Sequence, residues 1–230
     1  MSPIHCQTDG LHLLSFLFGK KGRKQMIITI SREMGSGGHT VGKMLAERLG
    51  YAFFDRKIIS EFAKEMNLDE KIVSENGENM SDQTYMDMVS GYVPFSRKER
   101  VPFEEIKKMQ DELMKRVAQK GNCVIVGRGS DYIFAGRKDA FHIFIHANME
   151  FRIARVQRRD GITGEESRIR RELEVKDHSR EMLYQYFSRR EWGKVGNYNL
   201  VIDTGVFTKT QSVELIMAAL EKLEGGWNHA

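Results

Sequence analysis

The chain has 230 residues, 40% of them hydrophobic and 30% charged, with a formal net charge of +4. This balance is typical of a soluble globular protein and excludes a disordered or collagen-like chain. The small positive excess favours anionic partners: nucleotides, nucleic acids or acidic surfaces. Cys6 and Cys123 lie far apart and in no metal-ligand spacing, so we expect a cytoplasmic protein with inert thiols.

The first 25 residues differ from the rest of the sequence. The apolar run "LHLLSFLF" (11–18) is too short to span a bilayer, and the basic cluster "KKGRK" (20–24) follows it, whereas a secretory signal has its charges in front. We expect residues 1–25 to be an N-terminal extension, either an over-called start or a peripheral helix. The alternative is an amphipathic stretch that touches a membrane.

From Met26 onward, short apolar runs alternate with helical patterns, and this alternation predicts a parallel sheet covered on both faces. We expect one α/β domain over residues 26–224, followed by a tail at 225–230. The expected strands are 26–30, 51–54, 123–127, 141–146 and 200–203. The expected helices are 40–50, near 57–66, 103–120, 149–159, 165–190 and 209–224. The irregular stretch 76–102 is either a mobile flap over a site or a surface insertion.

A glycine-rich turn, "SREMGSGGHT" (31–40), joins the first strand to the first helix. Its glycines permit the backbone angles of an anion-binding loop, and the helix N-terminus adds partial positive charge. The alternative is that these glycines only form a tight turn. The residues expected to surround a bound phosphate are Gly35, Ser36, Gly37, Gly38, His39 and Thr40.

Charged residues follow the next two strands. Asp55 and Arg56 come after the second strand, where open α/β sheets place ligands, and Asp55 is also a good helix N-cap. Arg128 follows the third strand, and its planar guanidinium suits a phosphate, although a buried salt bridge is the alternative.

Arginines recur at helical spacing in "FRIARVQRRDGITGEESRIRREL" (151–173). Two helices that meet at a glycine turn, with arginines on both, indicate a closing lid over 155–190 that would exclude water from a bound ligand. The alternative is that most of these charges form solvated pairs.

The segments "ITISREMGSGGHTVGKMLAERLGYAFFDRKII", "CVIVGRGSDYI" and "FIHANMEFRIARVQRR" resemble the cytidylate kinase-like family, within the P-loop nucleoside monophosphate kinases. The resemblance extends from Met26 to about Leu223. It implies a three-layer α/β/α P-loop NTPase fold with a five-stranded parallel sheet, a mobile monophosphate-binding region and a helical lid. It also implies ATP with Mg²⁺ as cofactor, with no side-chain metal ligand assigned.

The chain departs from the usual G-x-x-x-x-G-K-G-T loop of those kinases. Gly38 stands at the position of the lysine and Arg32 at that of the first glycine, so Arg32 is the leading substitute cation. Gly129 replaces the aspartate of the family's G-R-D segment, which leaves Asp131 as a displaced candidate.

The resemblance implies phosphoryl transfer from ATP to a nucleoside monophosphate, CMP or dCMP first. The alternatives are another small acceptor, or a non-catalytic nucleotide-binding regulatory protein. A nucleic-acid binder is disfavoured because there is no RNA-binding motif. The implied catalytic residues are Arg32, Arg128, Arg155, Arg159 and Arg180, the acceptor ligands are Asp55, Arg56, Arg128 and Asp131, and Asp177 organises the lid.

Overall fold

The computed structural model of the chain describes residues 25–58, 103–160 and 165–224. Residues 1–24, most of the helix expected near 57–66, the stretch 76–102, the turn at 161–164 and the tail at 225–230 lie outside these ranges. Within them, no helix is both long enough and apolar enough to cross a bilayer. The strands are β1 (Ile27–Arg32), β2 (Ala52–Phe54), β3 (Cys123–Val126), β4 (Ala140–His146) and β5 (Leu200–Asp203). The helices are α2 (Gly38–Leu49), α6 (Phe103–Gln119), α7 (Ser130–Ile133), α8 (Met149–Asp160), α9 (Glu166–Ser188) and α10 (Lys209–Glu224), with a 3₁₀ turn η1 (Val195–Asn197).

The five strands form one parallel sheet in the order β2-β3-β1-β4-β5. β1 lies at its centre, and Ile27, Ile28 and Ile30 of this strand have no exposed surface. A strand covered on both faces reads as a continuous apolar run, which is why the sequence predicts these strands to within two residues. The expected five-stranded parallel sheet is confirmed.

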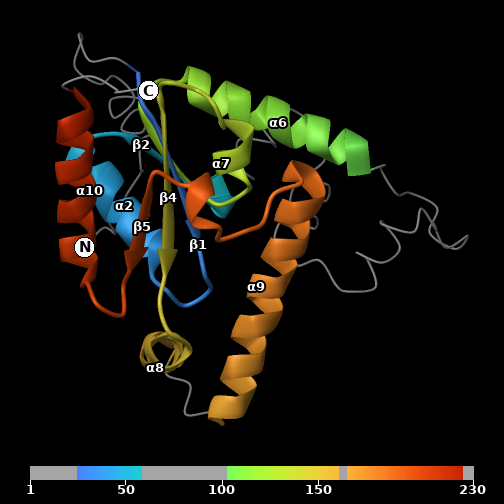
Figure 1. Cartoon of the computed structure of the whole chain (residues 1–230), viewed down its shortest axis with the longest axis vertical. Coiled ribbons are helices and arrows are strands. Elements are labelled where there is room, and N and C mark those ends of the chain that lie inside the picture. Colours follow the sequence, from blue (N-terminus) through green and yellow to red (C-terminus); the bar gives the residue numbers. More distant parts are fainter. Residues whose placement is uncertain (1–24, 59–102, 161–164, 225–230) are drawn as a thin grey trace, which may run out of the picture.

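Helices cover both faces of the sheet, as Figure 1 shows. Successive side chains of a strand point to opposite faces, so Ile28 and Ile30 of β1 pack with α2 and α10, while Ile27 packs with α6. Ile143 joins the first of these two cores and Ile125 the second. The expected three-layer architecture is confirmed.

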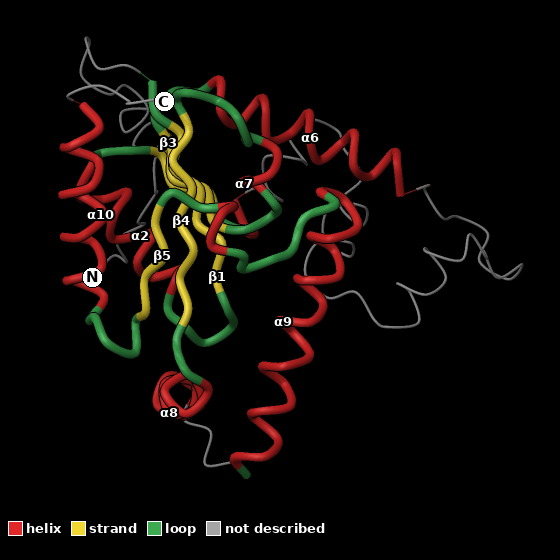
Figure 2. The backbone as a smooth tube through the Cα atoms, viewed as in Figure 1, coloured by secondary structure: helices red, strands yellow, loops and turns green. Residues whose placement is uncertain are grey.

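α8 and α9 lie apart from these layers. α8 follows the carboxyl end of β4, and α9 runs beside the loops at that end of the sheet (Figure 2). The two helices bury Ile153 and Val156 of α8 against Ile169 and Leu173 of α9, and Met34 of the glycine-rich turn packs on this cluster. The helices expected as a lid are therefore in direct contact with the loop.

Candidate active site

The glycine-rich turn leads from β1 directly into α2. Gly35 and Gly37 have φ of 84° and 98°, in the left-handed region that favours glycine. Gly37 is the N-cap of α2, and the Val41 N–H donates to the Gly37 carbonyl at 3.1 Å. The N–H groups of residues 38–40 precede this helical bond, so they face the loop with the positive end of the helix dipole behind them. This is the backbone form that phosphate binding requires.

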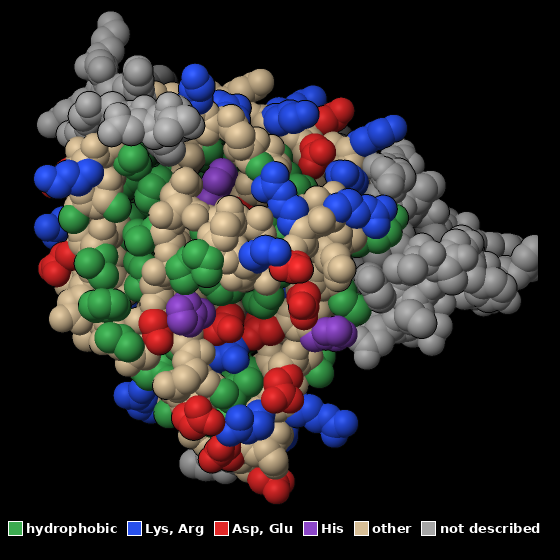
Figure 3. All heavy atoms as spheres, viewed as in Figure 1, with side chains coloured by type: hydrophobic (Ala, Val, Ile, Leu, Met, Phe, Trp, Pro, Cys, Tyr) green, Lys and Arg blue, Asp and Glu red, His purple; other side chains and the backbone are tan. Residues whose placement is uncertain are grey.

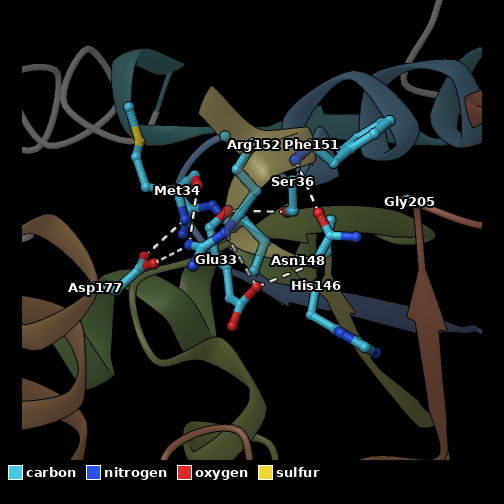
Figure 4. A network of polar contacts seen from close by, with 12 residues as sticks. Glu33, Met34, Ser36, His146, Asn148, Phe151, Arg152, Asp177 and Gly205 are labelled. Atoms are coloured by element: carbon cyan, nitrogen blue, oxygen red, sulfur yellow. Dashed lines mark hydrogen bonds and ion pairs between the residues drawn. The ribbon is translucent and has the colours of Figure 1, made fainter. Parts of the chain in front are cut away.

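A partly buried network of polar contacts fixes the loop to α8 and α9 (Figure 4). The Met34 N–H donates to Asp177 Oδ1 at 2.6 Å, and Arg152 donates from Nη1 to the Met34 carbonyl at 3.2 Å and to Asp177 Oδ2. Arg180 Nη1 donates to Asp177 Oδ1 and to the carbonyl of Arg32, both at 3.1 Å. Asp177 thus holds the loop and two arginines together.

The same loop is also held by the ends of β4 and β5. The Glu33 N–H donates to the Ile145 carbonyl at 3.0 Å, and Glu33 Oε2 accepts from the Ala147 N–H at 3.1 Å. The Thr204 hydroxyl, just after β5, donates to the Ser36 carbonyl at 2.5 Å. Contacts from α8 and α9, from the end of β4 and from the end of β5 therefore hold the loop backbone in one conformation.

Arg155 extends from α8 over the glycines. Its Nη1 donates to the Gly35 carbonyl at 3.0 Å and its Nη2 to Thr40 Oγ1 at 3.3 Å. A Cβ on Gly37 would lie 3.0 Å from the guanidinium carbon, so a side chain at position 37 would displace it. Burial, with the nearby charges of Arg159 and Arg158, lowers the pKa of Arg155. A cation with no carboxylate partner among the described residues therefore lies over an anion-binding loop.

Arg32 contacts the loop from the β1 side. It is the last residue of β1, it is half-buried, and its Cβ and Cγ pack against Gly38. Gly38 stands at the position that carries lysine in the resembling kinases. It is thus in contact with Arg32, the cation that we expect to replace that lysine.

A small cavity of about 50 Å³ lies beside the loop, at the carboxyl ends of β1 and β3. Arg128, Arg180 and Gln110 supply polar groups, and aromatic rings that include Trp192 close it. One water requires about 10–15 Å³ of such volume, so the cavity has room for a few waters or one phosphoryl group.

Arg128 adopts an unusual backbone conformation at the edge of this cavity. Its φ is 57°, between Gly127 at 80° and Gly129 at 63°, and Gln110 Nε2 donates to the Arg128 carbonyl at 2.5 Å. A left-handed arginine that is only 6% exposed is strained and held by its surroundings, as is common at functional sites. A Cβ on Gly129 would lie 2.0 Å from the Tyr132 ring, so a side chain at position 129 would require that ring to move.

Asp131 lies beneath the cavity rather than in its wall. It is 2% exposed, and Oδ1 accepts a hydrogen bond from the Ser31 hydroxyl at 3.0 Å. Burial raises the pKa of this carboxyl. Contact of Asp131 with an acceptor stays a prediction.

Asp55 caps the helical turn that follows β2 and also pairs with His39. Its Oδ1 accepts from the N–H groups of Lys57 and Ile58 at 3.0 Å, and its Oδ2 lies 2.9 Å from His39 Nε2. Burial opposes ionisation of Asp55, but the hydrogen bonds from Ile58 and His39 outweigh it and lower the pKa. Asp55 is therefore a helix cap that also contacts a side chain of α2. Arg56, the next residue, is half-buried.

The remaining lid arginines lie on the surface. Arg159 is exposed at the end of α8, one turn beyond Arg155. Arg170 pairs with Glu166 at 3.0 Å and with Glu150 at 3.3 Å, and acidic and basic side chains mix at this end of the molecule (Figure 3). Solvated pairs thus account for part of the basic run, as one of the two interpretations anticipated.

Several residues that build the site were not singled out from the sequence. Glu33 and Thr204 fix the loop, and Arg152 joins it to Asp177. Spacing gave no signal for Glu33 or Thr204, because their partners lie on distant strands. Arg152 lies in the arginine-rich run 151–173, but its spacing does not distinguish it from the neighbouring arginines.

The geometry of a glycine loop at the end of a central parallel strand agrees with comparisons to known proteins. A sequence model of the cytidylate kinase-like family matches residues 27–206. The chain belongs to this family. The cytidylate kinase of Methanopyrus kandleri is 27% identical over 207 residues, covering 86% of this chain and 94% of that protein. The cytidylate kinase of Archaeoglobus fulgidus is 30% identical over 201 residues, covering 85% and 95%.

A solved structure shares the fold of this cytidylate kinase-like chain. It is that of an uncharacterized protein from Eubacterium ventriosum ATCC 27560, with a TM-score of 0.64 and 22% identity, covering 86% of this chain and 99% of that one. The relatives support a kinase-like phosphotransferase, and the departures at positions 32, 38 and 129 lie within the residues that match the family.

Proposed function

We propose that this protein transfers the γ-phosphoryl group of ATP to a nucleoside monophosphate, with CMP or dCMP as the first candidate. The observation that carries this proposal is the Arg155 guanidinium, which contacts Gly35 and Thr40 of a loop that has no lysine. In phosphoryl transfer, catalysis is mostly positioning and charge stabilisation, so a cation at this place supplies what the loop sequence lacks.

On the donor side, the loop amides and the two arginines at positions 32 and 155 hold the ATP phosphates. Mg²⁺ keeps most of its waters and takes few protein ligands, all of them oxygen. The Thr40 hydroxyl, in the first turn of α2, fits this preference and would hold the ion. When bound with ATP, Mg²⁺ neutralises charge on the β- and γ-phosphate oxygens.

On the acceptor side, Arg128 and Arg180 line a cavity large enough for one phosphate. A phosphate of the acceptor held there would lie beside the loop, so that an acceptor oxygen reaches the γ-phosphorus while ADP leaves. The two-pronged geometry of arginine suits a phosphate better than the point charge of lysine.

The Asp55–His39 pair borders the loop on the β2 side, because His39 is the second residue of α2. The low pKa of Asp55 keeps it ionised at neutral pH. We assign it the orientation of the acceptor, with Arg56, as the family resemblance implies. The exposed apolar pair Val206 and Phe207 follows Thr204, which contacts the loop, and offers a surface for the base of ATP.

The test is ADP formation from ATP and Mg²⁺ across a panel of nucleoside monophosphates, with acceptor-free reactions as controls. We expect ADP that depends on the acceptor, and a matching nucleoside diphosphate as second product. ADP without any acceptor would indicate only ATP hydrolysis. Nucleotide binding without product from any acceptor would contradict the proposal and favour a regulatory protein or a non-nucleotide acceptor.

A further inference from the structure

The residues at positions 32 and 38 compete for the same space. A Cβ on Gly38 would lie 2.6 Å from Arg32 Cβ and 3.0 Å from Arg32 Cγ. Carbon atoms pack best at about 3.5–4.0 Å, so both contacts are repulsive. Rotation of the Arg32 side chain can relieve the contact with Cγ, but Cβ is fixed by the backbone. Any residue other than glycine at position 38 therefore requires a shift of the backbone while position 32 carries a side chain.

Neither backbone is free to shift. Arg32 is paired with Ile145 in the sheet, and its carbonyl accepts a hydrogen bond from Arg180. Gly38 is buried in the first turn of α2, and the Ser36 carbonyl just before it accepts from Thr204. The strand end and the helix start are thus held by separate contacts, and the glycine at position 38 is what permits arginine at position 32.

We propose that Arg32 and Gly38 form one unit, in which the cation of the phosphate loop has moved from the first turn of α2 to the end of β1. The aliphatic stem of Arg32 fills the space where the stem of a lysine at position 38 would begin. The arginine and that lysine are mutually exclusive, so only their joint exchange keeps a cation at one of these two positions. The chemical half of this inference rests on the proposed function, because it requires that the loop bind ATP.

The experiment compares Arg32→Gly, Gly38→Lys and the double variant with the unaltered protein. Melting temperature reports the steric half without any need for activity. Gly38→Lys should lower Tm by roughly 2–12 °C, as overpacking does in a domain of this size. Arg32→Gly removes Cβ, so the double variant should unfold well above Gly38→Lys. The unfolding losses of the two single changes should therefore not add.

Gly42→Ala provides the matched control. It also replaces a buried glycine of α2, but its Cβ would meet Val126 Cγ2 at 2.8 Å and Ile30 Cδ1 at 3.1 Å, and Arg32 is not among its nearest neighbours. When Gly42→Ala is combined with Arg32→Gly, the loss of Tm should equal the sum of the two single losses. If the losses from Gly38→Lys and Arg32→Gly also add, the steric half is wrong.

ATP affinity, measured by calorimetric titration with Mg²⁺, tests the chemical half. Arg32→Gly should weaken ATP binding roughly 10- to 100-fold, the range expected for one charge-assisted hydrogen bond or two. The double variant should recover most of that loss. If the double variant recovers Tm but not ATP affinity, Arg32 does not take the place of the loop lysine and the chemical half is wrong. If the unaltered protein binds no ATP, the proposed function fails and the chemical half with it, whereas the Tm cycle still decides the packing of positions 32 and 38.

Discussion

Arg155 donates hydrogen bonds to Gly35 and Thr40 of the glycine loop. Removal of its guanidinium leaves the loop amides and the Thr40 hydroxyl in place but takes away the charge between them. Arg158 of the same helix is exposed and donates to the Ala154 carbonyl of its own helix. The two positions therefore separate a general effect of charge on α8 from a contact with the loop.

Arg155→Ala should lower kcat/KM for phosphoryl transfer roughly 10³-fold or more, since arginines that stabilise the transition state contribute about 10³–10⁵ in P-loop enzymes. Steady-state ADP formation measures this. Arg158→Ala is the control and should change kcat/KM by less than about threefold. Equal losses in the two variants would mean that Arg155 acts only through the overall charge of the helix.

Arg128→Gly should make the fold more stable and acceptor binding weaker. The φ of 57° disfavours any side chain, so glycine at this position should relieve about 1 kcal/mol of strain. Loss of the guanidinium from the cavity should raise KM for the monophosphate at least tenfold. Chemical denaturation and acceptor titration check the two effects, and a destabilised variant would show that Arg128 contributes more to packing than it costs in strain.

Asp131→Asn should stabilise the protein at neutral pH and not at low pH. Burial raises the pKa of Asp131 in the folded state above its ordinary 3.8, so the folded protein binds the proton more tightly than the unfolded chain. The stability that this proton contributes is complete below pH 3.8 and is lost as pH rises through the folded pKa. The Tm difference between variant and parent should therefore grow above pH 3.8, and a constant difference would exclude this cause.

Helices α8 and α9 differ from the other helices in what they cover. They bury a small apolar cluster against Met34, and Asp177 of α9 accepts from the Met34 N–H across 143 positions of sequence. Hydrophobic periodicity predicts such helices well, because each buries one face, and their observed bounds lie close to the expected ones. It does not predict which loop they contact, since that depends on how the helices are rotated and tilted against the sheet.

Asp177→Ala should cost about 3–5 kcal/mol of stability, the usual result when one partner of a buried ion pair is removed. Arg152 and Arg180 both donate to Asp177, and their side chains are only 8% and 10% exposed. Denaturant unfolding measures the loss. Glu172→Ala breaks the exposed pair with Arg168 on the same helix and should cost less than about 1 kcal/mol. Similar costs would mean that Asp177 has no special structural role.

At the scale of the whole molecule, the sequence predicted the sheet, its two covering layers and the glycine loop. It did not predict how α8 presents Arg152, Arg155 and Arg159. These three share one basic pattern, yet the structure buries the first, places the second over the loop and exposes the third. Periodicity shows which residues share one face of a helix. Which of them reach the site depends on how the helix packs against the rest of the protein.

ATP should stabilise the whole domain, because its loop is joined to β4, β5, α8 and α9. With Mg²⁺ and ATP at a hundred times Kd, linkage contributes about 2.7 kcal/mol, which corresponds to a rise in Tm of roughly 5–11 °C for a chain of this size. Differential scanning fluorimetry measures it. Arg155→Ala should reduce the rise at the same ATP concentration, and an undiminished rise would place ATP elsewhere.

Trp192 places a fluorescent side chain in the wall of the cavity. Its indole lines the cavity with Arg128 and Arg180, and it meets the Phe144 ring edge-on at 5.4 Å between ring centroids. The sequence has only two tryptophans, so Trp227→Phe leaves Trp192 as the single tryptophan. A phosphate that enters beside Trp192 displaces water and brings negative charge close to the indole, both of which alter its emission. The protein thus carries an intrinsic fluorophore that should report acceptor binding in real time, separately from what happens at the ATP loop.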